Sequence, residues 1–284
     1  MAIPESELII NKDGSVYHLN LLPEHISDTI ITVGDPERVA KVSKYFDEIE
    51  VEVAKREFVT HTGYYKGKRL TVISTGMGTD NIDILMNELD ALVNIDFLSR
   101  EPNADKISLK IIRIGTSGSL QETVPLGSHL ASHYAVGLDS LMEFYPLPQN
   151  EDELSITEAL QKELGIGFRP YCVNGSESLI KKIAYDMIPG NTLTCPGFYA
   201  PQGRVLRAGL RNQQLLQKYH DFRLCDFQFT NFEMETAGYY SMGRLLGHEV
   251  LSLNAIVANR ITQQFAPNAD EVIDALILKV LERV

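Results

Sequence analysis

The 284-residue sequence contains no tryptophan and only three cysteines, Cys172, Cys195 and Cys225. Their spacing matches neither a disulfide framework nor a cysteine-rich metal site, so we expect three free thiols in a reducing cytoplasm. No apolar run reaches the roughly 20 residues that span a bilayer, and the N-terminal residues lack the basic and apolar regions of a signal peptide. These absences predict a cytoplasmic protein without a membrane segment.

Positive charge is also scarce, because 26 lysines and arginines face 38 acidic residues and leave a net charge of -12. An acidic surface argues against nucleic acid as a partner. A small anionic ligand is still allowed, since a few arginines can dominate one pocket. His129 and His133 lie four residues apart in a segment that reads as a strand, with no acidic partner to complete a zinc motif. We therefore expect no catalytic metal.

Short apolar strands alternate with amphipathic helices along the whole chain, which is typical of an α/β protein. The predicted strands are Thr29–Val33, Ile49–Val53, Leu70–Ser74, Leu109–Ile114, Ser128–Tyr134 and His248–Val257. The predicted helices cover about 36–46, 81–95, 153–164, 178–187, 212–219, 236–246 and 269–284. No repeat or flexible linker divides the chain, so we predict one domain over residues 1–284 with a mostly buried, mixed sheet.

The first candidate ligand site is Gly34-Asp35-Pro36-Glu37-Arg38, where a strand ends and a helix begins. Free N–H groups and the helix dipole favour an anion at a helix N-terminus, and Arg38 adds a positive charge beside it. The alternative is a plain turn with Arg38 in solvent.

A second candidate follows the strand that ends in Arg113-Ile114-Gly115-Thr116. An arginine inside an apolar strand is costly unless its charge is paired or meets a ligand. The glycines do not have the spacing of a dinucleotide-binding turn, and Ser119 breaks the pattern of a hydrolase nucleophile elbow. A structural salt bridge at Arg113 is the open alternative.

Two further segments combine groups suited to a sugar and a heterocycle. Asn231-Phe232-Glu233-Met234-Glu235 places two carboxylates on one side of an extended segment, where they could bind vicinal hydroxyls. Phe198-Tyr199-Ala200-Pro201-Gln202-Gly203-Arg204 offers an aromatic ring, a carboxamide and a guanidinium, which together could stack on a heterocycle and read its edge. The alternatives are a solvated helix N-terminus and an ordinary polar loop.

In this order, and together with His18-Leu19, these segments resemble the nucleoside phosphorylase-I family over nearly the whole chain. The resemblance implies a single α/β domain in which a twisted mixed sheet closes partly into a barrel flanked by helices. It also implies a pentosyl transfer in which inorganic phosphate cleaves a nucleoside, with no cofactor.

The resemblance assigns roles to individual residues. It implies a phosphate site at Gly34, Arg38, Arg113 and Thr116, completed by Arg56 from a neighbouring subunit. Ribose would contact Met234, Glu235 and Thr116, with the neighbour's His18 near the 5′-hydroxyl. The partners implied are therefore a nucleoside, phosphate and further copies of the chain. Relatives also bind a monovalent cation between subunits. Glu57 matches one of its ligands, but Asn81 stands where a serine ligand would be.

Base specificity is implied by two features. Phe198, Gln202 and Arg204 match the loop that reads uracil in pyrimidine-specific members, with Glu233 expected to orient that loop. Near the late strand, purine-specific members carry an aspartate, whereas this chain has Arg260 in a segment one residue longer than the bacterial pattern. We therefore expect phosphorolysis of uridine to uracil and ribose 1-phosphate. A purine nucleoside phosphorylase, a nucleosidase and a non-catalytic nucleoside-binding protein are the alternatives.

Overall fold

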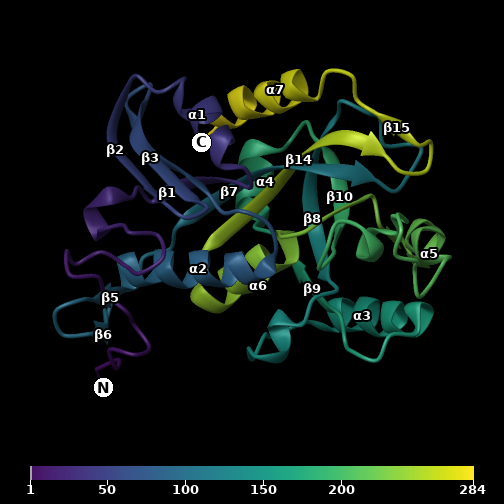
Figure 1. Ribbon diagram of the computed structural model, residues 1–284, viewed down its shortest axis with the longest axis horizontal. Helices are drawn as coiled ribbons and strands as arrows, with labels where there is room; N and C mark the ends of the chain where they lie inside the picture. The colour runs from purple at the N-terminus through teal and green to yellow at the C-terminus, as the bar shows by residue number, and fades with distance from the viewer. Residues whose placement is uncertain (1) are drawn as a thin grey trace.

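The computed structural model describes residues 2–284 and contains one large mixed sheet with helices on both faces (Figure 1). Its longer strands are β1 (Thr29–Val33), β2 (Glu48–Lys55), β3 (Phe58–Tyr65), β4 (Lys68–Ser74), β7 (Lys110–Ser119), β8 (His129–Gly137), β9 (Tyr171–Asn174), β10 (Ile188–Thr194), β13 (Asn231–Glu233) and β14 (Glu249–Asn259). The short strands are β5 (Ile95–Asp96), β6 (Glu101–Pro102), β11 (Arg223–Leu224), β12 (Phe227–Gln228) and β15 (Gln264–Phe265).

Seven α-helices and three short 3-10 helices lie among the described residues. The α-helices are α1 (Pro36–Ser43), α2 (Thr79–Asn94), α3 (Glu151–Leu164), α4 (Glu177–Ile183), α5 (Leu215–Asp221), α6 (Thr236–Leu246) and α7 (Ala269–Leu281). The 3-10 helices are η1 (Pro23–His25), η2 (Leu141–Glu143) and η3 (Ala200–Gln202). All seven predicted helices are confirmed, with ends that differ by a few residues.

The sheet closes on itself at one end. Strand β7 pairs with β1, β13 and β14, while β14 also pairs with β8, and β8 continues through β10 back to β13. The strands β7, β14, β8, β10 and β13 therefore form a closed ring, and β1, β4, β3 and β2 extend from it as an open sheet. The predicted partly barrel-like mixed sheet is confirmed.

The two faces of the sheet are buried under different helices, because neighbouring residues of a strand point to opposite sides. Ile31 of β1 and Ile112 of β7 pack under α1, α4 and α7. Their neighbours Ile30 and Ile111 pack under α2 and α6. Figure 1 shows α1 and α7 on one side of the sheet and α2 and α6 on the other. This double burial explains why these strands read as continuous apolar runs.

Four of the longer strands were missed by the sequence prediction: β3, β9, β10 and β13. Strand β10 contains Pro189, Gly190 and Asn191, which normally interrupt strands. The Leu130 side chain occupies the space where a Cβ of Gly190 would lie, and the register with β8 shifts between Gly190 and Asn191. The breaker residues therefore mark a close approach and a bulge inside a strand rather than its end.

Candidate active site

A cavity of about 470 Å³ opens where several strands of the ring and the open sheet end. It brings together ten of the residues predicted for the site, which are Gly34, Arg38, Arg113, Thr116, Phe198, Gln202, Arg204, Glu233, Met234 and Glu235. The carboxyl ends of strands in an α/β sheet are where such folds place ligands. These segments, far apart in the sequence, therefore form one site.

The anion end of the cavity lies where β1 passes into α1. Pro36 occupies the first turn of α1, and Asp35 caps the helix by accepting a hydrogen bond from the Glu37 N–H at 2.9 Å. The next residue, Arg38, is half-buried and turns toward β7, where its Nη1 lies 3.4 Å from the Ile114 carbonyl. Burial, together with the charge of Arg113, lowers the pKa of Arg38. Arg38 therefore lies in the cavity wall rather than in solvent.

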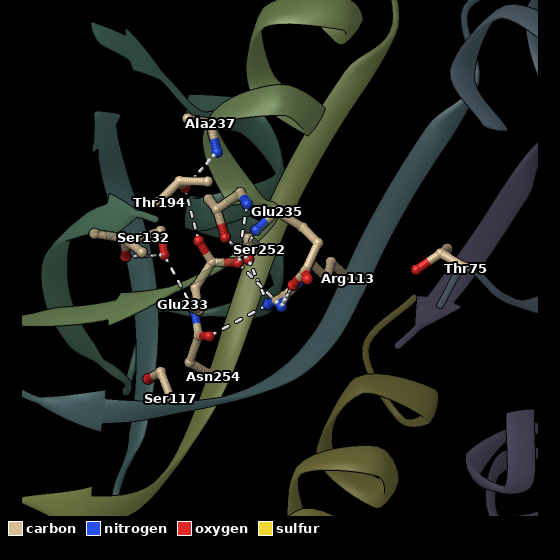
Figure 2. A network of polar contacts seen from close by, with 12 residues as sticks. Thr75, Arg113, Ser117, Ser132, Thr194, Glu233, Glu235, Ala237, Ser252 and Asn254 are labelled. Carbon is tan, nitrogen blue, oxygen red and sulfur yellow. Dashed lines mark hydrogen bonds and ion pairs between the residues drawn. The ribbon is translucent and has the colours of Figure 1, made fainter. Parts of the chain in front are cut away.

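Arg113 is the centre of a buried polar network (Figure 2). Its Nη2 lies 2.5 Å from Glu235 Oε2 and 3.0 Å from Glu233 Oε2, and its Nη1 faces Ser252 and Asn254. Burial alone would lower the pKa of Arg113, but the two carboxylates outweigh it and raise that pKa. The salt bridge considered from the sequence exists, and it lies inside the cavity.

The two carboxylates have different surroundings although they are two residues apart. Glu233 ends β13, accepts hydrogen bonds from the Glu235 and Thr236 N–H groups at the start of α6, and accepts another from Thr194 Oγ1 at 2.7 Å. Glu235 occupies the N-cap position of α6, and its side chain accepts a hydrogen bond from the Gly78 N–H at 2.9 Å. Burial raises the pKa of Glu235, and the charge of Arg113 opposes that rise. Neither acid is the solvated helix terminus considered from the sequence.

Glu233 was expected to orient the base-reading loop. Within residues 2–284 its oxygens contact Arg113, Thr194 and the first amides of α6, and orientation of the loop through water or Arg204 stays a prediction. The structure thus gives Glu233 the position of a fixed counter-ion that also holds the start of α6.

The base end of the cavity is formed by η3 and the residues around it. The Arg204 guanidinium carbon lies 3.7 Å from the centre of the Phe198 ring, and Arg204 Nη1 donates to Gln202 Oε1 at 2.5 Å. Burial, with a contribution from the Arg260 charge, lowers the pKa of Arg204 to about 10. Gln202 is buried and Phe198 is half-exposed at the mouth. A stacking surface, an amide and a guanidinium therefore converge here.

Arg260 does not line the cavity. Its Nη1 donates to the Gln202 carbonyl oxygen at 3.1 Å, and its guanidinium lies over the Phe232 ring. Strand β14 contains a bulge between Ile256 and Ala258, where its register with β7 shifts. The bulge lets the adjacent residues Val257 and Ala258 both face the cavity. A direct contact between Arg260 and a base stays a prediction.

Arg56 and His18 also lie outside the cavity of their own chain. Arg56 is exposed at the turn between β2 and β3, where its backbone is left-handed with φ of 56°. His18 precedes β1 and pairs with Glu88 of α2. Glu57 and Asn81 both flank Gly76 at the rim, so the residues considered for a monovalent cation are neighbours. Occupation of that position stays a prediction.

Several residues of the site were missed from the sequence. Ser252 and Asn254 alternate along β14 and face Arg113, and the parallel register pairs Ser252 with Arg113. Polar residues two apart in an otherwise apolar strand were the available signal. Thr194, which joins Glu233 to α6, lay in the unrecognised strand β10. Among residues 2–284 no group of three His, Cys, Asp or Glu side chains is arranged to hold a metal ion, and no helix is long and apolar enough to cross a bilayer.

Comparison with known proteins defines the class. Residues 28–282 match the Phosphorylase superfamily, and the chain belongs to this family. A uridine phosphorylase from Thermococcus kodakarensis is 31% identical over 257 residues, which cover 89% of this chain and 81% of the relative. A uridine phosphorylase from Haemophilus influenzae is 28% identical over 267 residues, which cover 90% of this chain and 90% of the relative. A DeoD-type purine nucleoside phosphorylase from Alkaliphilus metalliredigens is 26% identical over 86% of this chain and 88% of its own.

A solved structure supports the same family and fold. A nucleoside phosphorylase from Trypanosoma brucei, whose crystal structure is described as showing uridine phosphorylase activity, superposes with a TM-score of 0.87 at 28% identity. The similarity covers 98% of this chain and 100% of that chain. The predicted family and fold are therefore confirmed.

Proposed function

We propose that this protein is a uridine phosphorylase, which cleaves uridine with inorganic phosphate into uracil and ribose 1-phosphate. The observation that carries the proposal is the set of groups that line one cavity: two guanidinium groups with two carboxylates beside a helix N-terminus, and an aromatic ring with an amide and a further guanidinium. These groups suit phosphate, ribose and a heterocyclic base. The similarity to several uridine phosphorylases supports the same substrate.

In the reaction the bond from ribose C1′ to the base nitrogen breaks, and a phosphate oxygen forms a new bond to C1′. The base leaves with the electron pair and takes up a proton, so the atoms balance without an oxidant or a cofactor. Arg38, Arg113 and Thr116 would hold the phosphate against the sugar, which supplies proximity and orientation. Met234 and Glu235 would contact the ribose and fix its hydroxyls.

Negative charge gathers on the base as it leaves. Arg204 and Gln202 are placed to stabilise that charge, because both converge at the base end of the cavity. One well-placed donor of this kind is worth about 10²–10³ in turnover. Phe198 offers its ring as a stacking surface, and Arg260 holds the loop through the Gln202 carbonyl.

Residues of β14 argue against a purine nucleoside phosphorylase. A purine nucleoside phosphorylase of this family would place an aspartate there, whereas Val257 and Ala258 occupy the cavity wall at the β14 bulge. Two apolar side chains cannot protonate a purine nitrogen. Uridine should therefore exceed inosine and adenosine in kcat/KM by orders of magnitude, and a preference for either purine nucleoside would overturn this assignment.

The decisive test is uridine consumption followed by ultraviolet absorbance, with and without phosphate. Release of uracil only when phosphate is present is the expected result. Cleavage at the same rate without phosphate would identify a nucleosidase. The absence of cleavage, despite binding of uridine, would identify a nucleoside-binding protein.

The catalytic unit proposed here is at least a dimer. Within one chain the cavity holds Arg38 and Arg113 together with Glu233 and Glu235, and Arg113 is already paired with both carboxylates. A phosphate dianion therefore needs a further cation. Arg56, exposed and outside its own cavity, matches the residue that relatives supply from the neighbouring subunit.

Subunit mixing tests this sharing. R56A and E235A, each inactive alone, should regain part of the activity when they are dissociated and reassembled together, because a mixed dimer holds one intact site. Exchange of subunits is confirmed beforehand by native mass spectrometry. A mixture that exchanges but stays as inactive as its parents would refute the shared site.

A further inference from the structure

The Glu88 carboxylate on α2 holds His18 through an unusual set of contacts. Glu88 Oε1 lies 2.6 Å from His18 Nδ1. Both Glu88 oxygens also accept the His18 backbone N–H, at 2.9 and 3.0 Å, and Oε2 accepts the Leu19 N–H at 2.8 Å. The Glu88 side chain is largely buried, with 14% exposed, and that of His18 is 27% exposed. One carboxylate thus fixes the backbone and the ring of the same histidine.

These contacts decide which ring nitrogen of His18 carries a proton. An ionised carboxylate only accepts hydrogen bonds, and Glu88 already accepts from two backbone N–H groups. Its third partner, Nδ1, is then the donor. In a neutral imidazole the other nitrogen, Nε2, keeps a free lone pair. Within residues 2–284 no hydrogen bond engages His18 Nε2, so this lone pair is available to a ligand.

The His18 ring lies beside an aromatic side chain that also contacts two cations. Tyr17 packs edge-on against His18 with ring centres 4.7 Å apart, and its own ring lies near both Lys55 and Arg56. Lys55 Nζ also donates to the Tyr17 carbonyl. His18 and Arg56, both expected in the neighbouring subunit's site, are thus linked through the Tyr17 ring.

We propose that Glu88 is a positioning residue for the reaction of the neighbouring subunit. It holds His18 with Nδ1–H inward and the Nε2 lone pair outward, so the site accepts a hydrogen bond from the 5′-hydroxyl of the nucleoside. The inference rests on the proposed function and sharpens its substrate class. The preferred substrate is a nucleoside whose 5′ position can donate a proton.

The tautomer can be measured without any turnover. Histidine labelled with ¹⁵N is incorporated into the wild-type oligomer, and the His18 signals are assigned by their loss in H18A. A two-bond hydrogen–nitrogen correlation spectrum should show a protonated Nδ1 and an unprotonated Nε2 for His18. In E88Q the amide NH₂ can donate to Nδ1, so the proton should move to Nε2. Protonated Nε2 in the wild type would overturn the proposal.

Kinetics test the consequence for the substrate. Wild type and E88Q are compared on uridine and on 5′-deoxyuridine, which lacks the 5′-hydroxyl. E88Q should lower kcat/KM for uridine by up to about tenfold, the size expected for one hydrogen bond, because the 5′-hydroxyl must then turn to accept from Nε2–H, and should change the value for 5′-deoxyuridine less than twofold. E122Q, the same change at an exposed loop position, is the matched control and should leave both values unchanged.

A purely structural role for Glu88 gives a different result. If the side chain only anchors the segment around His18, E88Q lowers kcat/KM equally for both substrates, and the proposal fails. In the H18A background E88Q should produce no further change in the ratio of the two substrates. A further change would mean that Glu88 acts by another route. If the wild type does not cleave uridine, the proposed function fails, while the tautomer measurement still decides the role of Glu88.

Discussion

Gly115 decides where the Arg113 guanidinium can lie, which makes G115A a sharp perturbation of the site. A Cβ at position 115 would lie 2.0 Å from Arg113 Nη1 and 2.5 Å from Cζ. Ordinary contact begins at 3.4 Å, so the guanidinium has to move by about 1.4 Å. That movement is large beside the roughly 0.5 Å range of N–H···O distances in hydrogen bonds.

The buried network leaves Arg113 little room for this movement. The guanidinium is held by Glu233 and Glu235 and faces Ser252 and Asn254, and the residue is only 5% exposed. Breaking one partner away from a buried ion pair typically costs about 3–5 kcal/mol. We expect G115A to lower the free energy of unfolding by a substantial part of that amount. It should also lower kcat/KM for uridine by about 10²-fold or more.

The assay combines urea unfolding with phosphorolysis kinetics over a range of phosphate concentrations. G167A is the matched control, because a Cβ there meets no atom within 4 Å and its backbone is not left-handed. It should behave like the wild type. If G115A is as stable and as active as G167A, the guanidinium can be displaced freely, and the reasoning about Arg113 is wrong.

Two further predictions concern the base loop and the fold. R204A should lower turnover of uridine by about 10²-fold but that of 5-fluorouridine, whose base leaves more easily, by much less, and equal losses would show that Arg204 only packs. R244M should lower the free energy of unfolding by about 3 kcal/mol in urea, because Arg244 pairs at 2.7 Å with Glu153, which is fully buried. R169M removes an exposed 3.4 Å pair with Glu158 and should cost under about 1 kcal/mol, so equal losses in the two variants would contradict this ranking.

The sequence predicted those parts of the fold that depend on local pattern. Strand β1 has the predicted bounds because its apolar run ends at a glycine and a helix-starting proline. Helix α6 was also predicted with its observed bounds. Strand β10 was missed because Pro189 and Gly190 have a meaning only beside strand β8 and Leu130. Local propensity contains no information about a neighbour that lies far away in the sequence.

The candidate site, like the fold, could be predicted only in part from the sequence. The resemblance put the ligand-binding groups at the right positions of the chain, and the cavity brings most of them together. The sequence could not show that Arg113 pairs with both Glu233 and Glu235, because that contact joins β7 to the start of α6. Nor could it show that Glu88 holds His18 across 70 positions. These contacts join segments that lie far apart in the sequence and meet only in the folded chain.

Some ligand-binding groups of the site lie on paired strands, and others lie on a loop. Arg113, Ser252 and Asn254 lie on β7 and β14, which pair over ten positions in the closed ring. Side chains on paired strands are held more precisely than side chains on loops. By contrast, Gln202 is the last residue of a single 3-10 turn, η3, and Arg204 follows its C-cap Gly203, which has a left-handed backbone. Phosphate and ribose would therefore meet a fixed framework, whereas the base meets a segment outside the main sheet. The loop is joined to the end of β14 by the Arg260 contact with Gln202, but η3 is not part of the sheet, so changes in the loop can alter base selection while the anion end keeps its geometry.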